Sequence, residues 1–131
     1  MSFTVRDWMV DLIVFVDPDA TVTEALKLMR RRYIHSLIVS KSAAHPEYGI
    51  VTSTDISDKI IADERDPNRT RVREIMSSPV LTVSADLSLK ACAELMRQKR
   101  IHHLPVSDET GEIIGMISAT DFLVAAEAMG R

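Results

Sequence analysis

Two short segments of the chain place a carboxylate beside hydroxyl side chains. Residues 49–55 read Gly-Ile-Val-Thr-Ser-Thr-Asp, and residues 115–121 read Gly-Met-Ile-Ser-Ala-Thr-Asp. A carboxylate offers several acceptor lone pairs, so Asp55 and Asp121 can each accept hydrogen bonds from two neighbouring hydroxyls of a ligand. The alternative is that each aspartate stabilises the positive end of a following helix, and one side chain can fill both roles.

Histidines form a second candidate set. His35 lies in the first half of the chain, and His102 and His103 lie together in the second. A neutral imidazole donates one hydrogen bond, whereas an imidazolium adds positive charge. An anion held by these side chains would therefore bind more tightly as the pH falls toward the ordinary histidine pKa of about 6.5. The alternative is an exposed histidine ahead of a buried strand.

These residues belong to an internal repeat. The pattern of residues 5–39 recurs at residues 72–106 with an offset of 67 (72 − 5 and 106 − 39), and the Gly-to-Asp block recurs with an offset of 66 (115 − 49). A repeat of this size constrains the fold before any other feature does. The change of one in the offset indicates a single-residue insertion, which belongs in the loop at residues 40–48.

Each copy predicts the order β-α-β-β-α. In the first copy Thr21 and Glu24 have the spacing of a capping box, and apolar residues follow at helical spacing. The second copy repeats this pattern behind Ser88. The expected strands cover residues 12–16, 37–39 and 50–51 in the first copy and residues 80–83, 104–106 and 113–117 in the second. A hairpin turn is expected at residues 107–111, and further helices are expected to begin near Asp55 and Asp121.

Bulk composition narrows the class of protein. The chain has 131 residues, of which 46% are hydrophobic and 27% are charged, as in folded globular proteins. Neither half buries much apolar surface alone, so the halves should pack on each other. A net charge of −3 argues against a broad basic surface for nucleic acid. Without a membrane-length apolar run or a secretion signal, we expect a complete, unprocessed cytoplasmic protein.

Cysteine and metal chemistry are not expected. The single cysteine, Cys92, excludes an intrachain disulfide and takes the place of Ala25 in the repeat, so it is interpreted as a small core residue. The four histidines are too scattered for a zinc signature. Trp8 corresponds to Ile75, which favours a packing role. No catalytic triad, phosphate loop or paired-carboxylate site is recognisable, so we do not expect an enzyme.

The repeated motifs resemble the cystathionine-β-synthase (CBS) domain, and the pair resembles a stand-alone Bateman module. Three features carry the resemblance: the Gly-to-Asp block in both copies, Ile-His-His-Leu-Pro-Val at residues 101–106, and Val-Arg-Glu-Ile-Met-Ser at residues 72–77. It covers nearly the whole chain. It implies an α/β fold (α+β in some schemes) of two CBS repeats at residues 1–62 and 72–131, joined by a linker at residues 63–71. The repeats would have pseudo-twofold symmetry, with their sheets packed together.

The same resemblance implies a regulatory function. Such modules bind AMP, ADP, ATP or S-adenosylmethionine in clefts between the repeats and signal by a conformational change. No cofactor is required, although Mg²⁺ would accompany ATP. Stand-alone modules pair into disc-like homodimers and act on an effector protein, which the sequence does not identify. Nucleic acid and membrane partners are not expected.

Site residues follow by position in the motif. The resemblance places ribose contacts at Asp55, Asp121, Thr52, Thr54, Ser118 and Thr120. It places phosphate contacts at His102, His103 and His35, and adenine walls at Ile13, Val80, Ile50 and Met116. Family members often pair a histidine with an arginine at the phosphate position. This chain departs from that pattern, because His103 stands at the arginine position and Ser36 is its counterpart in the first copy.

The copies therefore predict two unequal sites. In this family a site takes its ribose aspartate from one repeat and its phosphate contacts from the other. The Asp55 cleft would then receive His102 and His103 and would suit a charged nucleotide better, whereas the Asp121 cleft would receive only His35 and Ser36. Two alternatives remain open: an interaction module that dimerises with empty clefts, and a nucleic-acid-binding module.

Overall fold

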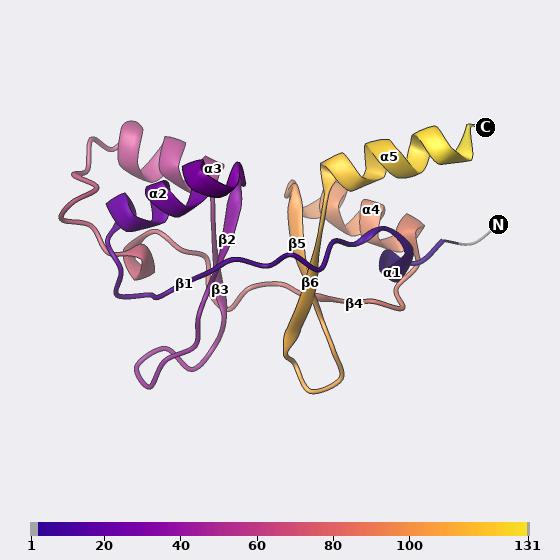
Figure 1. The fold of residues 1–131 in the computed structure, drawn as a ribbon, viewed down its shortest axis with the longest axis horizontal. Coiled ribbons are helices and arrows are strands. Elements are labelled where there is room, and N and C mark those ends of the chain that lie inside the picture. The colour runs from indigo at the N-terminus through magenta and orange to yellow at the C-terminus, as the bar shows by residue number, and fades with distance from the viewer. Residues whose placement is uncertain (1–2, 131) are drawn as a thin grey trace. The chain divides into compact units, whose positions relative to one another are not determined.

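The computed structural model describes residues 3–130, which form two compact units. Unit 2 contains residues 14–80, and unit 1 contains the residues up to 13 together with those from 81 onward. Each unit has a three-stranded sheet with helices packed against it (Figure 1). The expected α/β class with two β-α-β-β-α repeats is confirmed.

Unit 2 is built on the sheet order β1-β2-β3. Its β1 is parallel to β2, and β2 is antiparallel to β3 with Ile38 opposite Ile50. Its core contains Ala25 and Met29 of the first long helix and Leu37 of β2. Its elements are β1 (Phe15–Val16), α2 (Val22–Arg32), β2 (Ser36–Val39), β3 (Gly49–Thr52), α3 (Ser53–Asp55), the π-helical segment η1 (Ile56–Ile61) and the short 3₁₀ helix η2 (Val72–Glu74).

Unit 1 repeats this design in the order β4-β5-β6. Here β4 is parallel to β5, and β5 is antiparallel to β6 with Pro105 opposite Met116. Cys92 and Met96 of its first long helix pack against Leu104 of β5. Its elements are α1 (Val5–Trp8), β4 (Val83–Ser84), α4 (Leu89–Lys99), β5 (His103–Ser107), β6 (Ile113–Ser118) and α5 (Ala119–Met129).

Short-range capping signals set where the first long helix of each repeat begins. The Thr21 hydroxyl accepts a hydrogen bond from the Glu24 amide at 3.2 Å, and the Glu24 carboxylate accepts one from the Thr21 amide at 3.1 Å. This is the predicted capping box. In the second copy the Ser88 hydroxyl accepts from the Ala91 amide at 3.1 Å. The exposed residues Arg30, Arg31 and Arg32 end α2, where positive charge is favourable.

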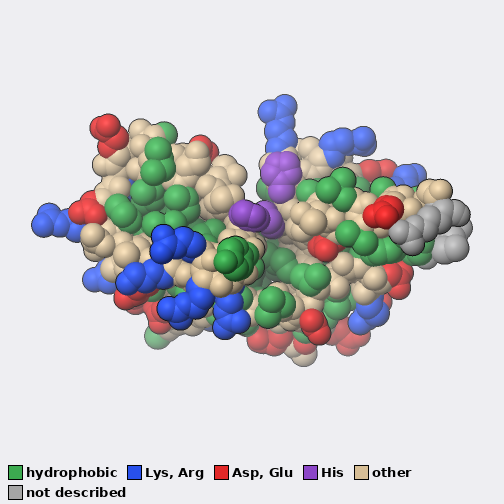
Figure 2. Space-filling view, turned by 45° about the horizontal axis from the view of Figure 1, so that its top comes forward, with side chains coloured by type: hydrophobic (Ala, Val, Ile, Leu, Met, Phe, Trp, Pro, Cys, Tyr) green, Lys and Arg blue, Asp and Glu red, His purple; other side chains and the backbone are tan. Residues whose placement is uncertain are grey.

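Part of the face shown in Figure 2 carries a local group of basic side chains. Figure 2 shows several Lys and Arg side chains together on the part of the chain drawn at the left, with acidic side chains distributed around the face in view.

The first strand of each repeat is shorter than predicted. Residues 12–16 were expected to form a strand, but only Phe15 and Val16 pair with β2. In the second copy the pairing begins at Val83 instead of Val80. In the second copy the amide of Val80 bonds elsewhere, to the carbonyl of Tyr48 at 3.0 Å, whereas the carbonyl of Val14 in the first copy still accepts from the amide of Ile38 in β2 at 3.0 Å.

The turn between β5 and β6 forms as predicted. Gly111 has φ +88°, a conformation that glycine adopts without strain. The Asp108 carboxylate accepts hydrogen bonds from the Thr110 hydroxyl at 2.7 Å and from the amides of Thr110 and Glu112. These donors, the Thr110 hydroxyl foremost, hold the pKa of Asp108 below its usual range.

The opening segment of each sequence repeat lies in the unit formed mainly by the other repeat. The segment around α1 starts the first repeat in sequence but lies in unit 1, whereas η2 opens the second repeat but lies in unit 2. Figure 1 shows the indigo N-terminal helix beside the orange and yellow elements of unit 1. Val5 and Val72 are both fully buried, each in the core of the other repeat's sheet. The units in space therefore differ from the repeats in sequence.

Backbone pairing fixes each exchanged segment. Val10 and Met116 exchange two hydrogen bonds, at 2.9 and 2.8 Å, and Ile50 and Ser77 exchange two at 2.9 Å. A glycine adjoins each pair. A Cβ at Gly115 would lie 2.9 Å from the carbonyl oxygen of Val10, and one at Gly49 would lie 3.1 Å from that of Ser77 and 2.9 Å from the Met76 sulfur. The close approach explains why the repeated block begins with glycine.

Replacing Gly115 should be costly. In Gly115→Ala the new methyl group must displace the Val10 backbone, so the free energy of unfolding should fall by about 1–3 kcal/mol. Gly130→Ala is the matched control, because its nearest contacts would lie at 3.6 Å. Urea denaturation of both variants measures the difference. Equal stabilities of the two variants would contradict the close-approach explanation.

Cys92 is a core residue, as predicted from its alignment with Ala25. Its side chain is fully buried, and burial raises the pKa of the thiol above its usual range. The reactive thiolate is therefore scarce at neutral pH. We expect almost no reaction with a disulfide reagent in the native protein and complete reaction in denaturant. Since Cys92 is the only cysteine, the signal is unambiguous, and rapid labelling of the native protein would refute a packed thiol.

Candidate functional site

The two repeated carboxylates stand at equivalent places in the two units. Asp55 is the last residue of α3 and accepts a hydrogen bond from the Thr52 amide at 2.9 Å through Oδ2. Asp121 in the first turn of α5 accepts one from the Ser118 amide at 2.8 Å, also through Oδ2. Each carboxylate therefore stabilises the start of its helix. This role leaves acceptor capacity on both carboxylates for a ligand.

The second carboxylate oxygen differs between the copies. Oδ1 of Asp55 accepts from Nζ of Lys59 at 3.0 Å, and the Asp55 side chain is 13% exposed. Lys59 also donates to the carbonyl oxygen of Ile75 at 2.8 Å. Within residues 3–130 no side chain or amide donates to Oδ1 of Asp121. Among the described residues, the first carboxylate is thus paired with a cation and the second is not.

Hydroxyl side chains flank both carboxylates. Thr52 and Ser118 end the strands β3 and β6 and are half-buried, and their hydroxyls lie 3.4 and 3.3 Å from Oδ2 of the neighbouring aspartate. Thr54 and Thr120 are exposed on the first turns of the following helices. The predicted ribose set of each repeat is therefore gathered at one strand-to-helix junction.

Backbone hydrogen bonds join the histidine segments to the same junctions. The carbonyl oxygen of His35 accepts from the Ser53 amide at 3.0 Å, and that of His102 accepts from the Ala119 amide at 3.0 Å. The side chains of His35 and His102 are exposed, whereas His103 is half-buried at the start of β5. Each predicted phosphate residue thus lies beside the helix start of its own unit.

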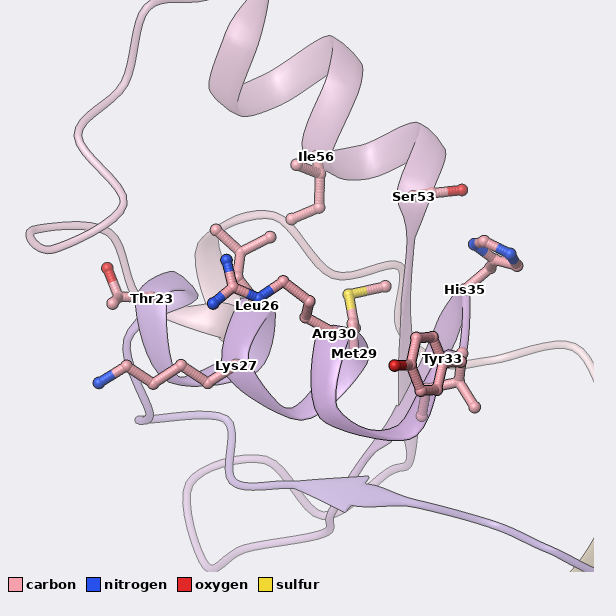
Figure 3. A pocket seen from close by; sticks show the side chains of 10 residues that line it. Thr23, Leu26, Lys27, Met29, Arg30, Tyr33, His35, Ser53 and Ile56 are labelled. Atoms are coloured by element: carbon pink, nitrogen blue, oxygen red, sulfur yellow. The ribbon is translucent and has the colours of Figure 1, made fainter.

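A groove opens between the two helices of each repeat, a feature that the sequence reasoning did not predict. In unit 2 it has a volume of about 740 Å³, and Figure 3 shows Leu26, Met29 and Ile56 facing one another, with Tyr33 and His35 at one end. In unit 1 a smaller groove of about 330 Å³ contains Met96, His102 and Phe122, the counterparts of Met29, His35 and Ile56. In the sequence, the helical spacing of apolar residues was the signal that could have predicted an apolar groove between these helices.

The proposed adenine-wall residues divide between the units. Ile50 is 8% exposed and pairs with Ile38, and Met116 is 9% exposed and pairs with Pro105. Val80 and Ile13 are half-buried, the first in unit 2 and the second in unit 1. Their part in binding stays a prediction.

The described part of the chain offers neither a cluster of metal-binding side chains nor a helix suited to span a membrane. No group of three or more His, Cys, Asp or Glu side chains in residues 3–130 is arranged to hold a metal ion. None of the described helices is long and apolar enough to cross a membrane.

Comparison with known proteins identifies the repeats. The family model of the CBS domain matches residues 5–62 and 72–128. An uncharacterized protein of Methanopyrus kandleri is 32% identical over 111 residues, which are 85% of this chain and 56% of that protein. This chain thus spans little more than half the length of that relative.

Solved structures share the fold over the whole chain. A hexameric CBS-CP12 protein from bloom-forming cyanobacteria is 34% identical with a TM-score of 0.90, covering 100% of this chain and 76% of that one. The CBS domain pair of protein MJ0100, solved with 5′-methylthioadenosine and S-adenosyl-L-methionine, has a TM-score of 0.84 over 98% of this chain and 99% of that one. At 24% identity, the second likeness concerns the fold alone.

Proposed function

The chain belongs to the CBS domain family and carries two such domains in tandem, and on that premise we propose that it is a regulatory module that binds adenosyl ligands. AMP, ADP, ATP and S-adenosylmethionine are the candidates. Mg²⁺ would enter only with ATP, held mainly by the phosphates. The module binds and signals and does not catalyse.

The observation that carries this proposal is the recurrence of one polar junction in both units. Each junction offers a half-buried carboxylate, already oriented by a backbone amide, with a hydroxyl at 3.3–3.4 Å from it. A fixed carboxylate is suited to accept hydrogen bonds from the 2′- and 3′-hydroxyls of a ribose. The fold already orders this side chain, so ligand binding loses less conformational entropy.

Ligands of related proteins support the choice of chemical class. The CBS pair of MJ0100 is solved with two adenosyl compounds, and it shares this fold. Exposed His35 and His102 supply hydrogen-bond donors near the helix starts, and His103 adds a third imidazole. We assign these imidazoles to the phosphates, and Ile13, Val80, Ile50 and Met116 to the adenine.

The module would transmit binding through an assembly. The helix α5 leaves apolar side chains exposed, with Leu123 at 72% and Met129 at 67%, and an apolar groove of about 480 Å³ lies beside it. Such a surface favours pairing with a second copy, which would form a disc-like homodimer. A coupling of about 1–3 kcal/mol between ligand and assembly would suffice for control of an effector protein.

The same exposed helix supports a second candidate function. A module that dimerises through α5 without a ligand would serve as an interaction domain. The two functions differ in one observable, because only the sensing module gains stability from an adenosyl ligand.

A ligand panel tests the sensing function. AMP, ADP, ATP and S-adenosylmethionine at 100 times Kd should each stabilise the folded protein by about 2.7 kcal/mol, which is seen as a rise in melting temperature. Inosine monophosphate is the control for the adenine ring. A flat response across the panel would favour the interaction domain instead.

Unequal sites form a separate prediction. Asn can still accept the capping hydrogen bond of the helix, so Asp55→Asn and Asp121→Asn remove the charge and keep the fold. We expect Asp55→Asn to weaken AMP binding about ten- to a hundredfold, the loss of charge-assisted hydrogen bonds, and Asp121→Asn to weaken it much less. Titration calorimetry measures the AMP affinity of both variants. Equal losses of affinity would contradict the prediction of unequal sites.

A further inference from the structure

Lys59 distinguishes the two ribose junctions and has no counterpart in the second repeat. It stands four residues after Asp55, and the offset of 66 places Ala125 at the same position after Asp121 (59 + 66 = 125). Ala125 is 1% exposed and packs in the core of unit 1. A cation is therefore present at one junction and replaced by a methyl group at the other.

The contacts of Lys59 hold its charge in place. Its Nζ donates to Oδ1 of Asp55 at 3.0 Å and to the carbonyl oxygen of Ile75 at 2.8 Å, and the side chain is 39% exposed. An ammonium group has three N–H donors, so one remains for a ligand oxygen. Ile75 itself is fully buried, which anchors the acceptor. This differs from the surface pair Lys90–Glu94, where the atoms are 3.9 Å apart and Lys90 is 87% exposed.

The backbone around Lys59 is also specific to this copy. Residues Ile56–Ile61 are wound as a π-helix, in which the Ala62 amide donates to the Ser57 carbonyl at 2.9 Å. The matching residues of the second copy belong to the regular α-helix α5. A π-helical turn is uncommon and is often found at functional sites. Here it contains the lysine that pairs with the ribose carboxylate.

These contacts give the two junctions different local charges. The Asp55 junction carries a carboxylate and an ammonium and is locally neutral, whereas the Asp121 junction carries a carboxylate without an ion-pair partner in the described residues. A negative ribose contact opposes the phosphates of a nucleotide and attracts a sulfonium. A neutral one opposes neither.

We propose that Lys59 is a specificity-determining residue that makes the Asp55 site select anionic adenosyl ligands and leaves uncharged or cationic ones to the Asp121 site. The inference rests on the proposed adenosyl-binding function and adds a division of ligands by charge. We take a separation of roughly 6–8 Å between the Lys59 ammonium and a ligand phosphate, and an effective dielectric constant of about 40. Coulomb's law then gives about a five- to tenfold difference in affinity per unit of ligand charge.

The test compares ligands that share adenosine and differ in charge. In an Asp121→Asn background, calorimetry with 5′-methylthioadenosine, AMP and ADP measures the Asp55 site. Lys59→Met should lower the affinity for AMP at least about fivefold and that for ADP further, with 5′-methylthioadenosine within about twofold of its starting value. Lys59→Arg keeps the charge and should keep the preference. Lys90→Met removes a surface charge elsewhere and should change none of the three.

The outcomes separate the two proposals. Absence of binding by the unmodified chain overturns the proposed function together with this inference. Binding that falls equally for all three ligands in Lys59→Met shows a structural role for Lys59 and overturns the inference alone, as does no change at all. If Lys59→Met does not fold, the single variants decide: Asp55→Asn should chiefly weaken AMP, and Asp121→Asn should chiefly weaken 5′-methylthioadenosine. The reverse pattern, or no difference, overturns the inference.

Discussion

The pairing of each opening segment with the last strand of the other repeat's sheet is the constraint on which the rest of the structure depends. Two pairs of backbone hydrogen bonds make it, Val10 with Met116 and Ile50 with Ser77. The approach is close enough that a side chain at Gly49 or Gly115 would collide with the incoming backbone or with a methionine sulfur. Each sheet therefore needs a segment that the other repeat supplies, and neither repeat is complete alone.

This constraint positions the polar junctions. The glycine opens β3 or β6, and the strand ends at the hydroxyl residue, Thr52 or Ser118, whose amide is bound by the following aspartate. Strand, hydroxyl and carboxylate are consecutive parts of one short segment, so fixing the strand also fixes the carboxylate. A candidate ligand contact is in this way held by the same hydrogen bonds that begin the helix.

Repetition also allows the copies to diverge without loss of the fold. Both copies keep the glycine at the close approach, the hydroxyl residue at the strand end and the carboxylate that accepts from its amide. They differ where folding permits either choice: Lys59 or Ala125 after the carboxylate, and a π-helical or an α-helical turn. Differences at positions that the fold leaves free are where a difference in ligand can be encoded.

The sequence by itself determined the fold class, the start of the first long helix of each repeat and the burial of Cys92. These depend on short-range patterns: helical spacing of apolar residues, capping residues three positions apart, and a repeat that can be compared with itself. Helices were also expected to begin near Asp55 and Asp121, and each aspartate lies in the first turn of its helix.

Only the tertiary structure decided which segment completes which sheet, because backbone pairing between distant residues has no local signature. In the folded chain the first strand of each repeat pairs over two residues only, and the Val80 amide bonds to Tyr48 instead of extending β4. It also revealed the bond from Lys59 to the carbonyl of Ile75, 16 residues away in the chain. The spacing of four between Asp55 and Lys59 could have suggested the ion pair, but the buried carbonyl that fixes the cation comes from the folded chain.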